Sequence, residues 1–170
     1  MTERSQGGVW LKALSCMVLG ALLAGPVAAT YNTDGSNQHQ ACLFSDTGAV
    51  PITVELAVTS EEKQQGLMER TSLAEDAGML FVYDELRPPS HAFWMYKTLI
   101  PLDIAFIAPE GTIRAIRSMV PCTSGPNSCA SYPAGVSFNR ALEMNAGFFG
   151  RNDIGVGDRF ARKDHRDCQG

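Results

Sequence analysis

The sequence predicts an α+β fold that is mainly β: a single small domain with a curled or barrel-like mixed sheet and one short helix after the first strand. Three observations lead to this class. Short apolar or alternating stretches, typical of strands, recur between residues 51 and 161. One clear helix signal follows the first of these stretches. After a predicted export signal the chain keeps 141 residues, which is enough for one domain with its own core.

The first strand and the helix are predicted from adjoining segments. Residues 51–58 alternate between apolar and polar side chains, as a half-buried strand does. Thr59 precedes Glu62 by three residues, which is the spacing of a capping box and predicts a helix start. The helix is expected to end near Gly66, because glycine favours the conformation that closes a helix.

The remaining elements are mostly strands. Pro109-Glu110-Gly111 predicts a hairpin turn with Gly111 in the left-handed conformation. Residues 148–151 are expected to form a short helical turn. The other expected strands are 78–83, 92–97, 102–107, 112–119, 136–144 and 159–161.

Residues 1–29 are predicted to be a secretory signal peptide. Arg4 and Lys12 give a positive start, residues 13–24 form a short apolar run, and small residues then offer a cleavage site. The run is too short for a spanning helix, which needs about 20 residues. A lipoprotein anchored at Cys16 and a retained anchor are the alternatives. The signal indicates export to the periplasm or the extracellular space.

The rest of the chain divides into a polar leader at 30–50, the domain at 51–162 and a C-terminal tail at 163–170. After signal removal it carries 12 basic and 17 acidic residues, with no basic patch. This charge argues against nucleic acid and anionic membranes as partners. No later stretch is long and apolar enough to span a bilayer, and no motif indicates a cofactor.

Export makes the four cysteines after the signal candidates for disulfides. Cys122 and Cys129 bracket a Gly-Pro-Asn turn that allows them to meet, and by elimination Cys42 pairs with Cys168. The long bridge is expected to stabilise by about 4 kcal/mol and the short one by about 2–3 kcal/mol. A metal site is the alternative, although the cysteines show no CxxC spacing and no adjacent histidine.

Asp103 is an acidic residue within an apolar run, and a buried carboxylate needs a partner. Counting back from the hairpin turn places Asp103 opposite Arg117, which predicts a cross-strand ion pair. This pair would account for Asp103 structurally. In the functional alternative, Asp103 is an anchor beneath a pocket and Arg117 fixes its charge.

Trp94 and Tyr96 are expected on one face of their strand. If residues 98–101 form a tight loop, Tyr96 lies opposite Asp103. Together with the nearby guanidinium of Arg117, they would form a wall suited to a sugar-like or cyclic ligand. The structural alternative is that both rings only cover the second face of the sheet.

Glu143 is expected on the strand face opposite Leu142 and Met144. With Asp103 it could form an acid–base pair of the glycosidase type, or it could instead accept hydrogen bonds from turn amides. Soft-metal binding is a further alternative, because five methionines and three histidines follow the signal. These methionines lie mainly within apolar runs, where methionine usually fills the core.

Several sequence blocks resemble the domain-of-unknown-function 192 family, and they lie at 55–70, 77–81, 93–104, 142–147 and 155–158. The resemblance covers about residues 51–162 and implies an exported domain of mainly β structure without an established activity. Tyr96 and Lys97 stand where the family usually has Lys and Asn, so no role of those two residues is carried over.

These observations favour a non-enzymatic exported domain that binds a small or glycan-like molecule, or a cell-envelope component. The predicted ligand-binding residues are Trp94, Tyr96, Asp103 and Arg117. One alternative is a periplasmic hydrolase that uses Asp103 and Glu143. The minor alternative is binding of a soft metal such as copper, for which no ligand set is assigned.

Overall fold

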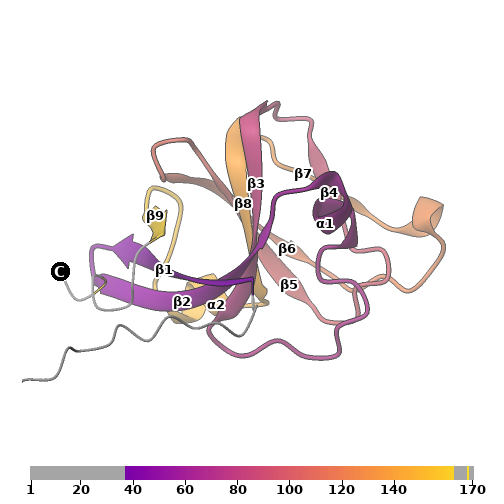
Figure 1. Cartoon of the computed structure of the whole chain (residues 1–170), viewed down its shortest axis with the longest axis horizontal. Coiled ribbons are helices and arrows are strands. Elements are labelled where there is room, and N and C mark those ends of the chain that lie inside the picture. Colours follow the sequence, from indigo (N-terminus) through magenta and orange to yellow (C-terminus); the bar gives the residue numbers. More distant parts are fainter. Residues whose placement is uncertain (1–36, 163–167, 169–170) are drawn as a thin grey trace, which may run out of the picture. The chain divides into compact units, whose positions relative to one another are not determined.

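The computed structural model describes residues 37–162 and Cys168. The predicted signal peptide and most of the predicted tail lie outside the described residues. Within the described part, Figure 1 shows a large sheet, a small sheet and short helices. The elements are β1 (Gln38–Ser45), β2 (Gly48–Ala57), α1 (Ser60–Gln65), β3 (Ala77–Arg87), β4 (Ala92–Trp94), β5 (Leu102–Ile107), β6 (Ile113–Met119), a 3-10 turn (Pro126–Ser128), β7 (Ser131–Pro133), β8 (Phe138–Asn145), α2 (Phe148–Arg151) and β9 (Arg159–Arg162).

The large sheet is mixed and has the strand order β6-β5-β8-β3-β2-β1-β9. Its neighbours pair antiparallel except β2 and β3, which are parallel because the chain crosses over through α1 between them. The sheet is not closed. A single bridge between Thr112 and Arg159 nevertheless draws its two edges together and curls it. The predicted class, mainly β with a curled mixed sheet, is confirmed. The helix predicted after the first strand is α1, which follows the second strand of the domain, and α2 is a further short helix.

Helix α1 begins at the predicted capping box. The Thr59 hydroxyl accepts a hydrogen bond from the Glu62 amide at 3.1 Å, and the Glu62 carboxylate accepts one from the Thr59 amide at 2.9 Å. The bond from the Thr59 backbone is the main reason that the pKa of Glu62 is lowered. No residue of α1 is buried, so its polar side chains stay accessible. No helix in the described part of the chain is long and apolar enough to cross a membrane.

Part of the predicted polar leader is a strand of the large sheet. Residues 38–45 form β1, which pairs with β2 along its whole length and buries Ala41, Cys42 and Leu43. This strand was not predicted, because the residues before Ala41 are polar and do not alternate with apolar ones. Both predicted disulfides are present, Cys42–Cys168 and Cys122–Cys129. Two disulfides favour an oxidising environment for the folded protein.

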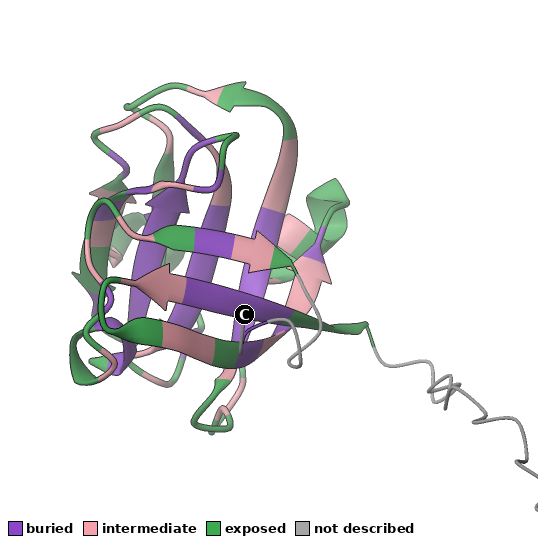
Figure 2. Ribbon diagram, turned by 90° about the vertical axis from the view of Figure 1, so that its left-hand side faces the viewer, coloured by how far each residue is buried: buried purple, intermediate pink, exposed green. Residues whose placement is uncertain are grey.

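The central strands bury both of their faces. Figure 2 shows buried residues along these strands, and all six residues of β5 are buried. One core cluster packs α2 against one face of the large sheet. It includes residues of β1 and β2, together with Leu142 and Met144 of β8. A second cluster lies on the other face, where β4 and the loop after α1 cover Phe81 and Phe106. Side chains from β8 therefore reach two different cores.

The β5–β6 hairpin contains a β-bulge that was not predicted from the sequence. The turn forms as predicted, and Ile107 faces Ile113. The next pair along the ladder is Phe106 with Ala115, so Arg114 is an extra residue on β6. Because side chains alternate along a strand, this single insertion changes the partner of every residue beyond it.

The predicted ion pair of Asp103 with Arg117 is therefore wrong. Asp103 faces Ser118, and Arg117 faces Ile104. The Arg117 guanidinium donates instead to the carbonyl oxygens of Ile116 at 2.9 Å and Ala134 at 3.1 Å. The bulge accounts for the wrong pairing, because the prediction counted residues back from the turn as if the two strands paired without interruption.

Gly78 is required by the close approach of β3 and β8. A Cβ atom at this position would collide with the Met144 sulfur and the Glu143 backbone oxygen. We expect Gly78→Ala to lower the free energy of unfolding by about 1–3 kcal/mol, through overpacking. Urea unfolding monitored by tryptophan fluorescence measures this change. Gly150→Ala is the control, since nothing lies within 4 Å of its Cβ position, and an equal loss in both variants would contradict the explanation.

Candidate functional site

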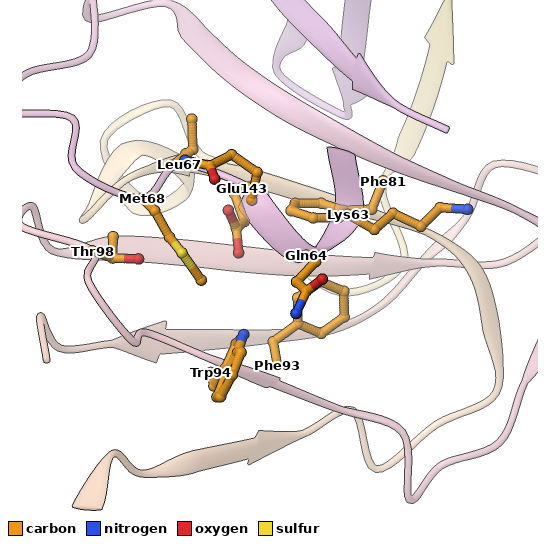
Figure 3. A pocket seen from close by; sticks show the side chains of 11 residues that line it. Lys63, Gln64, Leu67, Met68, Phe81, Phe93, Trp94, Thr98 and Glu143 are labelled. Carbon is orange, nitrogen blue, oxygen red and sulfur yellow. The ribbon is translucent and has the colours of Figure 1, made fainter. Parts of the chain in front are cut away.

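A narrow cleft lies between α1, β4 and the sheet, and we call it the inner cleft. Its volume is about 30 Å³, which gives room for a small functional group or one or two water molecules. Figure 3 shows side chains from these separate segments surrounding one space. The lining residues are Lys63, Gln64, Gln65, Gly66, Leu67, Met68, Phe81, Phe93, Trp94, Thr98 and Glu143.

Glu143 provides the carboxyl group of the inner cleft. It lies on β8, faces Ile104 across the β5–β8 ladder, and is 4% exposed. No hydrogen bond or ion pair joins this carboxyl to another residue in the described part of the chain. Burial raises the pKa of Glu143 to about 8, because removal from water penalises the charged form. At neutral pH the group is therefore mainly a neutral carboxylic acid.

Asp103 and Glu143 point to opposite faces of the sheet. Asp103 pairs with Met144, while the next residue on β5 pairs with Glu143, and consecutive side chains alternate. The predicted acid–base pair of the two carboxyls therefore does not form. The Asp103 carboxylate accepts a hydrogen bond from the Gly147 amide at 2.7 Å, at the start of α2. The contact with a turn amide that was considered for Glu143 is made by Asp103.

Trp94 and Tyr96 lie together, as predicted, but not beside Asp103. Their ring centroids are 5.5 Å apart, and Trp94 is 42% exposed. The expected pairing of their strand with β5 is wrong, because β4 pairs with β7 in a separate sheet. The four residues of the predicted wall therefore separate into two adjoining aromatic rings and two charged residues elsewhere.

The two rings line a wider hollow that we call the outer groove. Its volume is about 350 Å³, enough for a sugar ring. Four residues line both hollows, so the inner cleft and the outer groove adjoin. The outer groove is lined by Glu61, Gln64, Gln65, Met68, Trp94, Tyr96 and Lys97.

A disulfide-bonded loop holds the wall that carries these rings. The Lys97 amide donates to the Cys122 carbonyl at 2.8 Å, and the Cys122 amide donates to the Thr98 carbonyl at 3.3 Å. Cys122 is fixed in turn by its disulfide with Cys129. The Glu69 amide donates to the Lys97 carbonyl at 2.8 Å, which ties the loop after α1 to the same turn.

The nearby cations have other partners. The Lys63 ammonium lies 4.6 Å from the centroid of the Tyr83 ring, and the Lys97 ammonium is 3.4 Å from the Glu69 carboxylate. Burial raises the pKa of Tyr83 to about 12, so this ring is neutral. Its hydroxyl lies 3.3 Å from His91 Nε2, and burial lowers the pKa of that histidine. Glu143 therefore faces no counterion among the described residues.

The structure gives no metal ligand set among residues 37–162 and Cys168, where no three His, Cys, Asp or Glu side chains gather. The methionines considered for a soft metal are mostly core residues. Met79, Met95 and Met119 belong to one core cluster and Met144 to the other, while Met68 lines the inner cleft.

Sequence reasoning missed the polar residues on the helix side of the site. Gln64 and Gln65 line both hollows, and Thr98 lines the inner cleft although it is 5% exposed. Two signals were available. The predicted helix lacks an apolar face, and Thr98 is a polar residue within the apolar run that follows Trp94.

The fold and the site define a small mixed-sheet domain with a buried carboxyl beneath an aromatic-lined groove. The sequence profile of the domain-of-unknown-function 192 family, described as uncharacterized ACR, matches residues 42–161, and the chain belongs to this family. The family resemblance inferred from the sequence blocks is confirmed. No curated protein matches the chain.

Two solved structures resemble this chain over nearly all of their own length. A Sinorhizobium meliloti 1021 protein, provisionally described as a transcription regulator, is 38% identical with a TM-score of 0.65, covering 74% of this chain and 93% of that one. A protein of unknown function from Novosphingobium aromaticivorans DSM 12444 is 31% identical with a TM-score of 0.66, covering 78% of this chain and 91% of that one.

The backbone conformation at Lys97 is unfavourable for a lysine residue. Its φ of 57° is left-handed, a conformation that asparagine tolerates better than lysine. We expect Lys97→Asn to raise the free energy of unfolding by up to about 1 kcal/mol, because the lost ion pair is exposed and weak. Lys97→Ala is the control for the ion pair and should give no gain. Denaturant unfolding of both variants measures the difference.

The raised pKa of Glu143 predicts that the free energy of unfolding depends on pH. Its pKa rises from 4.5 in the unfolded chain to about 8 on folding, so the folded state retains a proton that the unfolded state has released. Stability should therefore fall as pH rises from about 5 to about 8, by at most about 1.4 kcal/mol per pH unit. Glu143→Gln should remove this slope. Unfolding curves at several pH values test it, and parallel slopes in the two proteins would show that Glu143 is ionised in the fold.

Proposed function

We propose that this protein is an exported, non-enzymatic domain that binds a glycan-like ligand along the outer groove. The observation that carries the proposal is the exposed ring of Trp94, paired with Tyr96 at 5.5 Å in a hollow of about 350 Å³. The two adjoining rings form an accessible apolar patch, and such patches often mark a binding site.

The chemistry of the groove matches a polyhydroxylated ring. The faces of Trp94 and Tyr96 offer apolar surface to the C–H side of a sugar. The amides of Gln64 and Gln65 supply both donors and acceptors for hydroxyl groups. Rings on one wall and amides on another are a suitable arrangement for a neutral, cyclic ligand.

Export is part of the proposal. Two disulfides fit an oxidising compartment, and the sequence predicts a signal at residues 1–29. A cell-envelope glycan would be present in that compartment. The provisional description of the Sinorhizobium protein as a transcription regulator is not transferred, because a net charge of −4 disfavours contact with DNA.

A hydrolase receives less support. Its two carboxyls would have to face one substrate, whereas Asp103 and Glu143 lie on opposite faces of the sheet. Asp103 is already used by the Gly147 amide. The site retains one buried carboxyl, which suits recognition of a ligand.

Trp94→Ala tests the proposal. We expect at least about a tenfold loss of affinity for any glycan that stabilises the wild-type protein, because the stacking surface is removed. A thermal-shift screen of glucan and cell-wall fragments, followed by calorimetric titration, measures it. The control is Leu86→Ala, which removes another exposed apolar side chain outside both hollows. Equal affinity of Trp94→Ala and wild type, or no stabilising glycan in the screen, would refute the proposal.

A further inference from the structure

The inner cleft holds a polar group without a partner next to a groove that fits a sugar ring. Glu143 is 4% exposed, forms no hydrogen bond to a described residue, and lines a cleft of about 30 Å³. Leaving a buried polar group unpaired costs free energy, and binding a matching group recovers it. The cleft is too small for a whole ring, so it fits one substituent of a ligand.

We infer that the inner cleft binds the acetamido group of an N-acetylated sugar whose ring stacks on Trp94. The inference rests on the proposed function, since it names the substituent that selects among glycans. The two hollows share Trp94, Met68, Gln64 and Gln65, so a ring in the outer groove can extend a substituent inward. In Figure 3 the side chains of Trp94 and Gln64 border the space that Glu143 also lines.

The lining of the cleft matches both ends of an acetamido group. Its amide needs one donor and one acceptor, which the Glu143 carboxyl and the Thr98 hydroxyl provide. Its methyl group needs apolar surface, which Leu67, Phe81 and Phe93 provide. A hydroxyl group would leave that apolar surface uncovered, and a methyl group alone would leave Glu143 unpaired.

A neutral substituent fits better than an ammonium group. The titratable groups around Glu143 are Tyr83 on β3 and Lys63 on α1, while its cross-strand partner Ile104 is apolar. The Lys63 ammonium lies over the Tyr83 ring, so an ammonium group in the cleft would meet only the uncharged acid form of Glu143. Burial holds Glu143 in its acid form at pH 7, and that form donates a hydrogen bond to an amide carbonyl.

The test compares three disaccharides that differ at one substituent. Calorimetric titration at pH 7 uses di-N-acetylchitobiose, cellobiose and fully deacetylated chitobiose with the wild-type protein. We expect the N-acetylated sugar to bind at least about tenfold more tightly than the other two. This comparison needs no variant and therefore no assumption about folding.

Two variants then assign the effect to Glu143. Glu143→Gln keeps a neutral donor and acceptor, and should retain affinity for di-N-acetylchitobiose within about threefold. Glu143→Met keeps the volume without the polar atoms, and should lose at least about tenfold. Wild-type affinity should fall above about pH 8, when the donor proton is lost, whereas Glu143→Gln should show no such fall.

The outcomes separate the inference from the proposed function. Equal affinity for cellobiose with dependence on Trp94 overturns the acetamido inference and leaves glycan binding in place. Preference for the deacetylated sugar, or loss of binding in Glu143→Gln, shows recognition of charge and also overturns the inference. Failure of all three sugars, in a protein that binds another glycan through Trp94, overturns the inference alone. Failure of every glycan overturns both.

Discussion

The two-sided burial of β3, β5 and β8 is the constraint on which the rest of the structure depends. A strand segment with cores on both faces cannot carry a charged side chain cheaply, so each buried acidic residue on it requires a local solution. Asp103 accepts a hydrogen bond from the Gly147 amide and thereby anchors α2. Glu143 has no such partner and keeps its proton at neutral pH, because burial raises its pKa. The same constraint produces one carboxyl that is bonded within the fold and one that lines the inner cleft.

Two separate sets of local interactions fix the two sides of the site. The capping box of Thr59 and Glu62 fixes the start of a helix that has no buried residue. On the other side, backbone hydrogen bonds from Cys122 fix the turn at Lys97 and Thr98, and a disulfide fixes Cys122. The cleft therefore depends on local bonds within loops as well as on the core residues Leu67, Phe81 and Phe93 that line it.

Features that depend on local chemistry were predicted correctly from the sequence, whereas contacts between distant segments were not. The capping box, the turn at Gly111, both disulfides and the mainly β class follow from residues near one another or from compartment. The partner of Asp103 could not be predicted in this way. The bulge at Arg114 leaves no signal in the sequence, because the residues of this strand fit the alternating pattern with or without it. The aromatic rings were recognised, but their separation from β5 depends on β7, a three-residue strand inside a loop.

The bond between Cys42 and Cys168 has a consequence for how the protein withstands proteolysis. It joins the two ends of the domain across 126 positions and so turns almost the whole fold into a covalent ring. A single cut in any exposed loop within this ring opens the chain without releasing a fragment. Strand β9 then stays paired with β1 at one edge of the large sheet, and the nicked molecule can keep its shape. In an oxidising environment, where such a bond persists, the ring limits the damage that a single proteolytic cut causes.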